Sequence, residues 1–227
     1  MSLPIFDASS HGEFTGLSGT IAHIVTNSHS NLVLIVDVTM DSASDIVTGI
    51  TYAGQALTEL TSIASSGHRI DRWYRLNPAT GTNNIVVSTS GGTNTFAVDA
   101  ASYYNVAQSS TFGTPATATG NSGSPSNTVV TTSTTQLVID GLFSTPGTSF
   151  TQPNGETVEV TDTTVWLAAL GDIPATGSNM TLTWTVTTTE WAQISVAMNV
   201  APSSGPTRFI TSMDPLMSPG YLPGITQ

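Results

Sequence analysis

The stretch of sequence that decides the fold class is Leu32-Val33-Leu34-Ile35-Val36-Asp37-Val38-Thr39-Met40. Both of its alternating sets of positions are apolar except at Asp37, a pattern typical of a strand that is buried on both faces. Its longest uninterrupted apolar run, Leu32 to Val36, is far too short to span a bilayer. We therefore predict that this stretch is a central strand of a buried β-sheet.

Outward from this strand, apolar or alternating runs of strand length recur in both directions, separated by turns rich in Asn, Gly, Ser and Pro. No segment shows a helical period over the length of a helix. This pattern predicts an all-β protein folded as a jelly-roll-like β-sandwich. The predicted strands are 20–26, 32–40, 46–52, 56–63, 69–76, 84–89, 95–104, 128–132, 136–143, 157–160, 165–170, 180–187 and 190–200.

The chain is predicted to consist of three segments, residues 1–16, 17–200 and 201–227. Residues 1–16 are predicted to be an extended N-terminal segment, and residues 17–200 to form the sandwich. A Ser/Thr/Gly/Pro-rich stretch, 108–127, is either a linker that divides the sandwich or a long loop across one end of it. Strand 136–143 resembles 32–40 in having a Leu-Val-Ile core with one Asp. The two halves do not align well enough to count as a repeat, so we expect one elaborated sandwich.

The last segment, 201–227, contains five prolines with apolar side chains between them. Proline lacks the backbone donor of a β-ladder, so this segment is predicted to be irregular and extended. The apolar side chains indicate an arm that docks on the body or on a neighbouring molecule. Its candidate contact residues are Arg208, Phe209, Met213, Leu216, Met217, Tyr221 and Leu222.

Charge excludes several partners. The chain has no lysine and only four arginines against fifteen carboxylates, which gives a net charge of −11. Binding to nucleic acid requires a basic stripe, and so does attraction to an anionic membrane surface. We therefore expect neither partner. The chain has no cysteine, which removes disulfides, thiolate metal sites and cysteine nucleophiles.

No motif indicates catalysis. The glycine-flanked serines do not complete G-x-S-x-G, and the four histidines have no metal-binding spacing. Asp41 and Asp45 lie in one loop and are weak candidates for a Ca²⁺ site, but an Asx/Ser turn explains them more simply. Glutamates near strands could serve a glycosidase only if two of them faced a cleft. We predict no enzyme activity, no cofactor and no metal.

The most unusual local feature is the segment 68–75, which carries three of the four cations, Arg69, Arg72 and Arg75. Alternation places Arg69 and Arg75 on one face of a strand, with Asp71 and Trp73, and Arg72 on the other. These arginines are candidates for contact with an acidic neighbour such as a second copy of the chain. A solvated strand with an internal Arg–Asp pair is an equally good interpretation.

The segments Ile50-Thr51-Tyr52-Ala53-Gly54-Gln55-Ala56-Leu57-Thr58 and Trp73-Tyr74-Arg75-Leu76-Asn77-Pro78-Ala79-Thr80-Gly81 resemble a β-sandwich pattern of bacterial surface proteins and phage structural proteins. The N-terminus also lacks the pattern of a secretory signal. Taken together, the chain resembles the capsid cement or decoration proteins of tailed bacteriophages.

This resemblance implies a virion structural protein that is synthesised in the host cytoplasm and lies on the capsid surface. It implies a homo-oligomer, with a trimer favoured, that binds the major capsid protein through extended arms. The alternative is a carbohydrate- or receptor-binding module of a phage fibre or bacterial adhesin, which should expose Trp or Tyr at a loop end. A hydrolase is a third class and would need paired carboxylates in a cleft.

Overall fold

The structure is a computed structural model, and it describes residues 3–26, 28–145, 149–163, 167–187 and 190–203. All of its regular elements are β-strands, and all strand pairs are antiparallel. The described residues contain no helix that is long and apolar enough to cross a membrane. The predicted all-β sandwich is therefore confirmed.

The first half of the chain forms two sheets that pack on each other. The first inner sheet has the order β1 (Ile5–Gly16), β9 (Asn94–Tyr104), β3 (Val33–Met40), β7 (Arg69–Leu76) and β6 (Thr58–Ala64). The first outer sheet has the order β2 (Ser18–Val25), β8 (Gly81–Thr89), β4 (Val47–Tyr52) and β5 (Gln55–Ala56). Positive φ angles at Ala53 and Gly54 form the tight turn between β4 and β5.

The second half of the chain repeats this arrangement. The second inner sheet has the order β10 (Ala116–Gly120), β18 (Glu190–Met198), β12 (Leu137–Thr145), β15 (Leu167–Pro174) and β14 (Thr157–Asp162). The second outer layer consists of two short ribbons. One pairs β11 (Ser126–Val129) with β16 (Met180–Thr183), and the other pairs β13 (Phe150–Thr151) with β17 (Thr185–Val186).

Strand order shows that the two halves share one topology. The order β1-β9-β3-β7-β6 in the first inner sheet matches β10-β18-β12-β15-β14 in the second, strand for strand in chain order. The orders β1-β9-β3-β7 and β2-β8-β4-β5 are those of the two four-stranded sheets of a jelly roll. The chain therefore folds as two jelly rolls in tandem, which agrees with the divided alternative that the sequence left open rather than with the preferred single elaborated sandwich.

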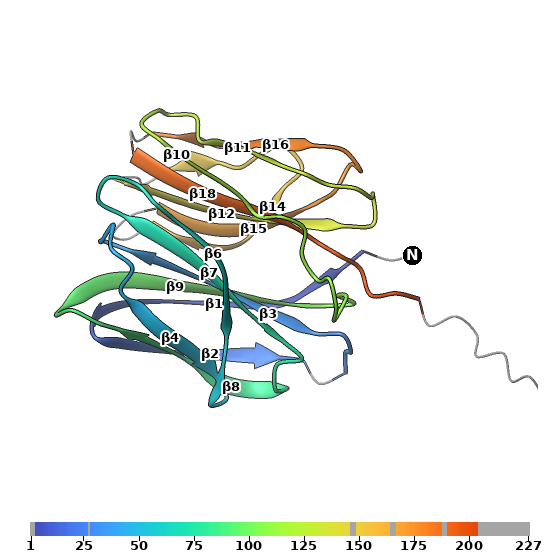
Figure 1. Cartoon of the computed structure of the whole chain (residues 1–227), viewed down its shortest axis with the longest axis horizontal. Coiled ribbons are helices and arrows are strands. Elements are labelled where there is room, and N and C mark those ends of the chain that lie inside the picture. The colour runs from blue at the N-terminus through green and yellow to red at the C-terminus, as the bar shows by residue number, and fades with distance from the viewer. Residues whose placement is uncertain (1–2, 27, 146–148, 164–166, 188–189, 204–227) are drawn as a thin grey trace, which may run out of the picture.

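The two jelly rolls stack into four layers, with the two inner sheets face to face in the middle (Figure 1). Strand β3 lies at the centre of this stack and is buried along its whole length, as predicted. Leu34, Val36, Val38 and Met40 face the first outer sheet. Val33 and Ile35 face the second inner sheet, where they pack in one cluster with Leu137, Ile139 and Val196. We call the contact region between the two inner sheets the seam. It forms a hydrophobic core separate from the core of each jelly roll.

Two segment boundaries differ from those predicted. Residues 5–16, which were predicted only to be an extended segment outside the sandwich, form the edge strand β1, paired along its length with β9. The stretch 108–127 contains β10 and the start of β11, so most of it belongs to the second jelly roll. The connection between the jelly rolls is 105–115, which is fixed by bridges from Val106 to Val200 and from Phe112 to Met198.

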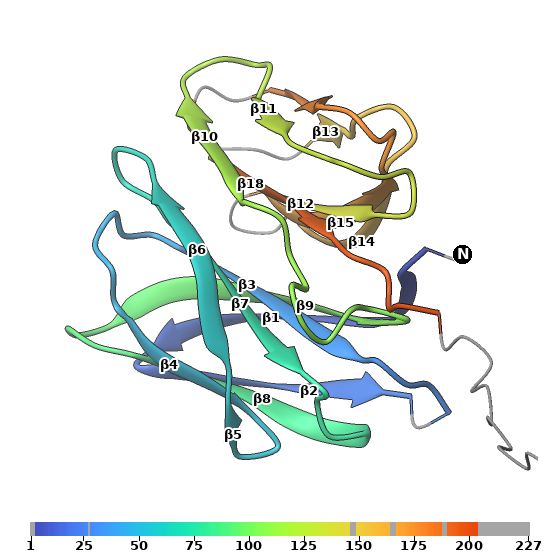
Figure 2. The same cartoon turned by 45° about the vertical axis from the view of Figure 1, so that its right-hand side comes forward.

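Both ends of the described chain meet at Asn105. Its side-chain Nδ2 donates to the carbonyl of Leu3 at 2.8 Å, and its carbonyl accepts from the backbone N–H of Ala201 at 2.9 Å. Figure 2 shows the N-terminus and the last described residues at the same end of the molecule. The predicted arm beyond Ser203, with its candidate contacts Arg208 to Leu222, lies outside the described residues.

Candidate functional site

The predicted alternation along β7 is confirmed. Trp73 packs toward the core of the first jelly roll, and Asp71 pairs with Arg69 on the same face. Ile70 and Tyr74 pack in the seam between the two inner sheets, on the face that also carries Arg72. The three arginines of β7 therefore have different surroundings and are described separately below.

Arg72 is fully buried in the seam. Its Nε and Nη2 donate to the two carboxylate oxygens of Asp37 at 2.8 and 2.7 Å, a bidentate pair within the first inner sheet. Its Nη1 donates across the seam to the carbonyl of Ile139 at 2.9 Å. The prediction that Arg72 contacts another molecule is wrong, because the strand face that carries it is covered by the second jelly roll.

A row of polar residues crosses the first inner sheet at the position of Arg72. The register places His11, Asp99, Asp37 and Arg72 directly opposite one another on β1, β9, β3 and β7. His11 Nδ1 lies 2.7 Å from Asp99 Oδ1 at one end of the row, and the Arg72–Asp37 pair forms the other end. Both buried carboxylates of this row, Asp37 and Asp99, thus have a cationic or N–H partner, which buried charges require.

Gly141 on β12 makes room for the ion pair from the opposite sheet. A Cβ atom at this position would clash with Asp37 Oδ2 and would lie 2.6 Å from Arg72 Nη2, well inside contact distance. The second inner sheet therefore approaches the ion pair closely only because residue 141 has no side chain. This fit between a glycine and a salt bridge fixes how the two jelly rolls align.

The other two arginines lie nearer the surface. Arg69 forms ion pairs with Asp71 and, at 3.4 Å, with Asp45. Arg75 is partly exposed, and it donates to the side chain of Gln55 and the carbonyl of Ala56. That they contact a neighbouring molecule stays a prediction.

The weak Ca²⁺ candidates Asp41 and Asp45 each lie beside a basic side chain. Asp41 Oδ1 is 3.2 Å from His68 Nε2, and Asp45 Oδ2 is 3.4 Å from Arg69 Nη2. Both carboxylates are more than half exposed. A basic neighbour satisfies a carboxylate without a metal ion, which favours the simpler interpretation of this loop as a turn.

The closest approach to a catalytic serine is the contact between Ser10 Oγ and His23 Nδ1 at 2.9 Å. His23 is buried, and burial lowers its pKa to about 4. Its Nε2 has no hydrogen-bond partner, so no carboxylate orients the ring as in a Ser-His-Asp triad. The arrangement is that of a neutral core histidine.

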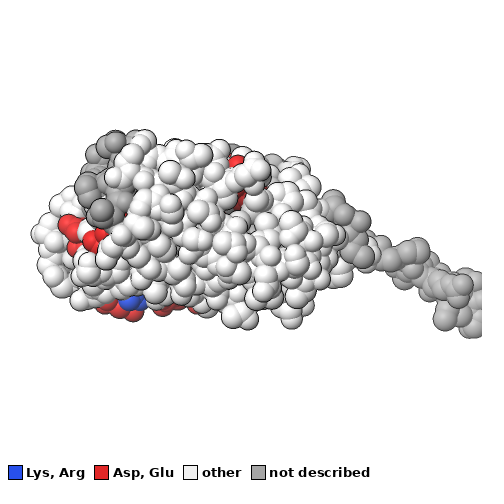
Figure 3. Space-filling model, turned by 90° about the horizontal axis from the view of Figure 1, so that it is seen from above, with Lys and Arg blue, Asp and Glu red and all other residues white. Residues whose placement is uncertain are grey.

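The outer layers differ from the inner sheets in their content of charged residues. Every strand of the first outer sheet and of the second outer layer lacks Asp, Glu, Lys and Arg. The exposed positions of these strands are instead mainly Thr, Ser and Asn, and Thr128 and Thr181 pair through their hydroxyls at 2.9 Å. Figure 3 shows the second outer layer from above as a largely uncharged face, with most charged atoms toward one end.

A pocket of about 570 Å³ opens beside this uncharged face. Its floor includes Ile173, Met180 and Leu182, and its rim carries neutral polar groups from residues such as Asn154 and Asn179. No charged or aromatic residue lines it. Trp184 and Trp191 are buried in the adjacent core, so neither offers an exposed ring to a sugar.

Comparisons with known proteins found no matching family model, no similar curated protein and no similar solved structure. The arginine-bearing strand was predicted from the sequence, but the uncharged outer layers were not. A signal for these layers is present in the sequence. Asp, Glu, Lys and Arg are all absent from the predicted strands 20–26, 46–52, 84–89, 128–132 and 180–187. Recognising a surface from it required knowing that these strands share the outer layers.

Proposed function

We propose that this chain is a non-enzymatic structural protein of a virion, a decoration or cement protein that packs against its own copies and against the major capsid protein. The observation that carries the proposal is the pair of charge-free outer layers on one continuous four-layer body. Jelly rolls are frequent among viral capsid domains, which agrees with this class of function.

Electrostatics explains why the outer layers are suited to such contacts. A chain with net charge −11 repels its own copies, and this repulsion is smallest where a surface carries no charge. The carboxylates of the described strands lie on the inner sheets, where several are buried. Copies that meet through an outer layer therefore keep their carboxylates apart.

Self-association is tested with the full chain by light scattering after size exclusion. We expect an oligomer, with a trimer favoured, and we expect Thr20→Glu or Thr181→Glu to dissociate it. Both residues are exposed, one on each outer layer. Thr15→Glu is the matched control, since Thr15 is exposed on β1 outside these layers. A monomeric full chain, or an oligomer that both outer-layer variants leave intact, would contradict the proposal.

The place of the chain in a particle is tested by immunogold labelling of virions with an antibody to residues 3–203. Labelled shells support the proposal, and particles that lack the chain overturn it. Truncation after Ser203 keeps every described strand, so the shortened protein should fold. We expect that the shortened protein is no longer incorporated into the shell, because the arm is predicted to bind neighbouring subunits.

The pocket beside β16 supports a second candidate, binding of a neutral carbohydrate. Its amide and hydroxyl rim can bond sugar hydroxyls, and its apolar floor can accept the face of a ring. A glycan array with the full chain tests this function. A hit that Asn154→Ala and Asn179→Ala abolish would support it, and an array without hits would remove it.

A further inference from the structure

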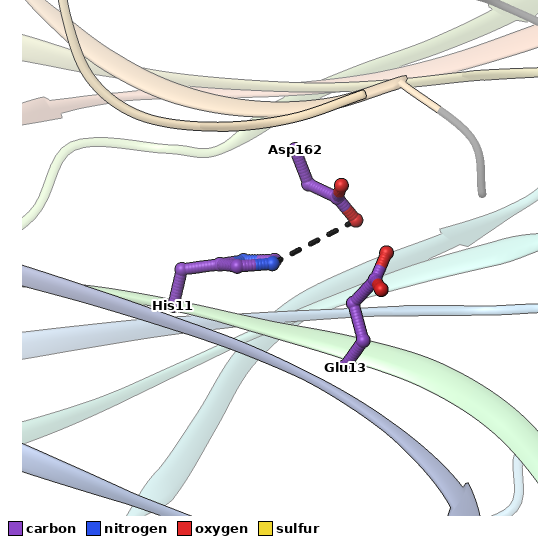
Figure 4. A group of neighbouring side chains, drawn as sticks. All are labelled: His11, Glu13 and Asp162. Carbon is purple, nitrogen blue, oxygen red and sulfur yellow. Dashed lines mark ion pairs between the residues drawn. The ribbon is translucent and has the colours of Figure 1, made fainter. Parts of the chain in front are cut away.

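Three potential ligand side chains converge where the two jelly rolls meet at one edge of the seam. His11 and Glu13 are two residues apart on β1, so they share a face of this edge strand. Asp162 is the last residue of β14, the edge strand of the second inner sheet. Figure 4 shows the side chain of Asp162 pointing down toward His11 and Glu13.

The distances suit a single small ion. One ligand atom from each residue lies within 4.8 Å of the other two, and His11 Nε2 is 3.8 Å from Asp162 Oδ2. Two ligands at about 2.0–2.1 Å from a tetrahedral Zn²⁺ are about 3.3 Å apart, so this pair needs to close only slightly. Glu13 is exposed, and rotation about its side-chain torsions can bring its carboxylate nearer.

A second observation, independent of the three ligands, also points to a metal. Asp99 is almost fully buried, and its Oδ1 lies 2.7 Å from His11 Nδ1. A carboxylate only accepts hydrogen bonds, so in the neutral ring Nδ1 carries the proton and Nε2 presents its lone pair. That lone pair is on the side of Asp162. A carboxylate that orients a histidine in this way is the usual support of a metal-ligating imidazole.

We propose that His11, Glu13 and Asp162 bind a divalent first-row metal ion, best represented by Zn²⁺, which bridges the two jelly rolls. An imidazole ligand favours Zn²⁺ over Ca²⁺ or Mg²⁺, which prefer oxygen ligands throughout. Three protein ligands leave one tetrahedral position for water. Two ligands come from the first jelly roll and one from the second, so the ion stabilises their association. The site is independent of the proposed function.

Binding is measured by titrating metal-free full chain with ZnCl₂ in a calorimeter. We expect one Zn²⁺ per chain and a melting temperature that rises with Zn²⁺ and falls again with EDTA. His11→Ala and Glu13→Gln should each weaken binding at least tenfold. Glu13 is exposed, so Glu13→Gln should keep the fold. His11→Ala also removes the hydrogen-bond partner of the buried Asp99, so circular dichroism must show that this variant is still folded.

Two further variants separate the metal site from unspecific binding. His68→Ala is the matched control, because His68 also lies near two carboxylates, those of Asp41 and Glu190. It should leave Zn²⁺ affinity unchanged. Asp99→Asn should weaken binding about tenfold without removing a ligand, because it reduces the basicity of His11. The proposal is overturned if Zn²⁺ does not bind at millimolar concentration, or if His11→Ala and His68→Ala weaken binding equally.

Discussion

The two jelly rolls share a strand order but differ in what their cores contain. In the first, aliphatic and aromatic side chains from both sheets fill the core, and the buried His23 is kept neutral. In the second, Asp140 is fully buried and accepts hydrogen bonds from Trp184 Nε1, Gln193 Nε2 and Ser195 Oγ at 2.7, 2.9 and 2.7 Å. A polar group is therefore compatible with this fold where the core supplies its partners.

The second jelly roll also buries a carboxyl group without such partners. Both oxygens of Glu156 lack a hydrogen-bond partner. Burial, together with the nearby carboxylates of Asp140 and Asp172, raises the pKa of Glu156 to about 10. One topology thus supports an apolar core and a core with two carboxyl groups, those of Asp140 and Glu156. The strand order depends on which positions face inward, and less on which side chains occupy them.

The largest expected effect comes from breaking the seam that both jelly rolls share. Asp37→Ala leaves the buried guanidinium of Arg72 without its counter-charge, which should cost about 3–5 kcal/mol of unfolding free energy. Urea unfolding measures the loss. Asp45→Ala, at the exposed end of an Arg69 pair, is the control and should change stability by less than about 0.5 kcal/mol. Equal effects would mean that the buried pair does not hold the seam.

The next effect is specific to the second core. Asp140→Ala removes the acceptor of three buried donors, and we expect a loss of about 3 kcal/mol in urea unfolding. Ser195→Ala removes only one of these donors and should cost about 1 kcal/mol. If the two variants lost the same amount, the network around Asp140 would not be what stabilises this core.

A smaller loss is expected from Gly141→Ala, which places a methyl group against the Arg72–Asp37 pair. Overpacking of this kind costs about 1–3 kcal/mol. Gly49→Ala, where an added Cβ meets nothing within 4 Å, should be nearly neutral. Thermal unfolding of the two variants compares them directly. A neutral Gly141→Ala would show that the inner sheets separate easily.

The last effect depends on pH and arises from Glu156. Its folded pKa lies above its unfolded value, so the folded state binds one more proton than the unfolded state between pH 7 and 9. Stability should therefore fall as pH rises through this window, with Glu156 contributing about 1.4 kcal/mol per pH unit. His23, with a pKa lowered to about 4, is neutral in the folded state throughout this window.

Glu156→Gln tests this contribution, because the amide keeps the shape of the side chain without titrating. Denaturant unfolding at several pH values should give a flatter dependence for the variant than for the parent chain. The variant should also be the more stable of the two at pH 9. Parallel pH dependences would show that Glu156 is ionised in the folded protein.

The sequence predicted the elements whose burial is uniform or strictly alternating. Strand β3, which is buried throughout, and strand β2, which alternates between exposed and buried residues, are examples, since their patterns need no knowledge of neighbouring strands. Strand β1 was missed because an edge strand with Asp, Ser, His and Glu among its residues shows little apolar alternation. The second outer layer was hard to recognise because β13 and β17 contain only two residues each.

The metal site was beyond the reach of sequence reasoning for a geometric reason. His11 and Glu13 are close in the chain, but Asp162 comes from the other jelly roll and Asp99 from the opposite end of the first. Their proximity depends on the register of β1 with β9 and on how the inner sheets stack. The same dependence explains why Arg72 was predicted to be a contact residue when it is buried.

The meeting of Leu3, Asn105 and Ala201 has a practical consequence for engineering this protein. Because both ends of the folded body emerge at one pole, a tag or cargo fused to either end would project in the same direction. The short distance between the ends also suits circular permutation. New ends could be opened in the exposed turn at 121–124, at the far side of β10 from the connection between the jelly rolls.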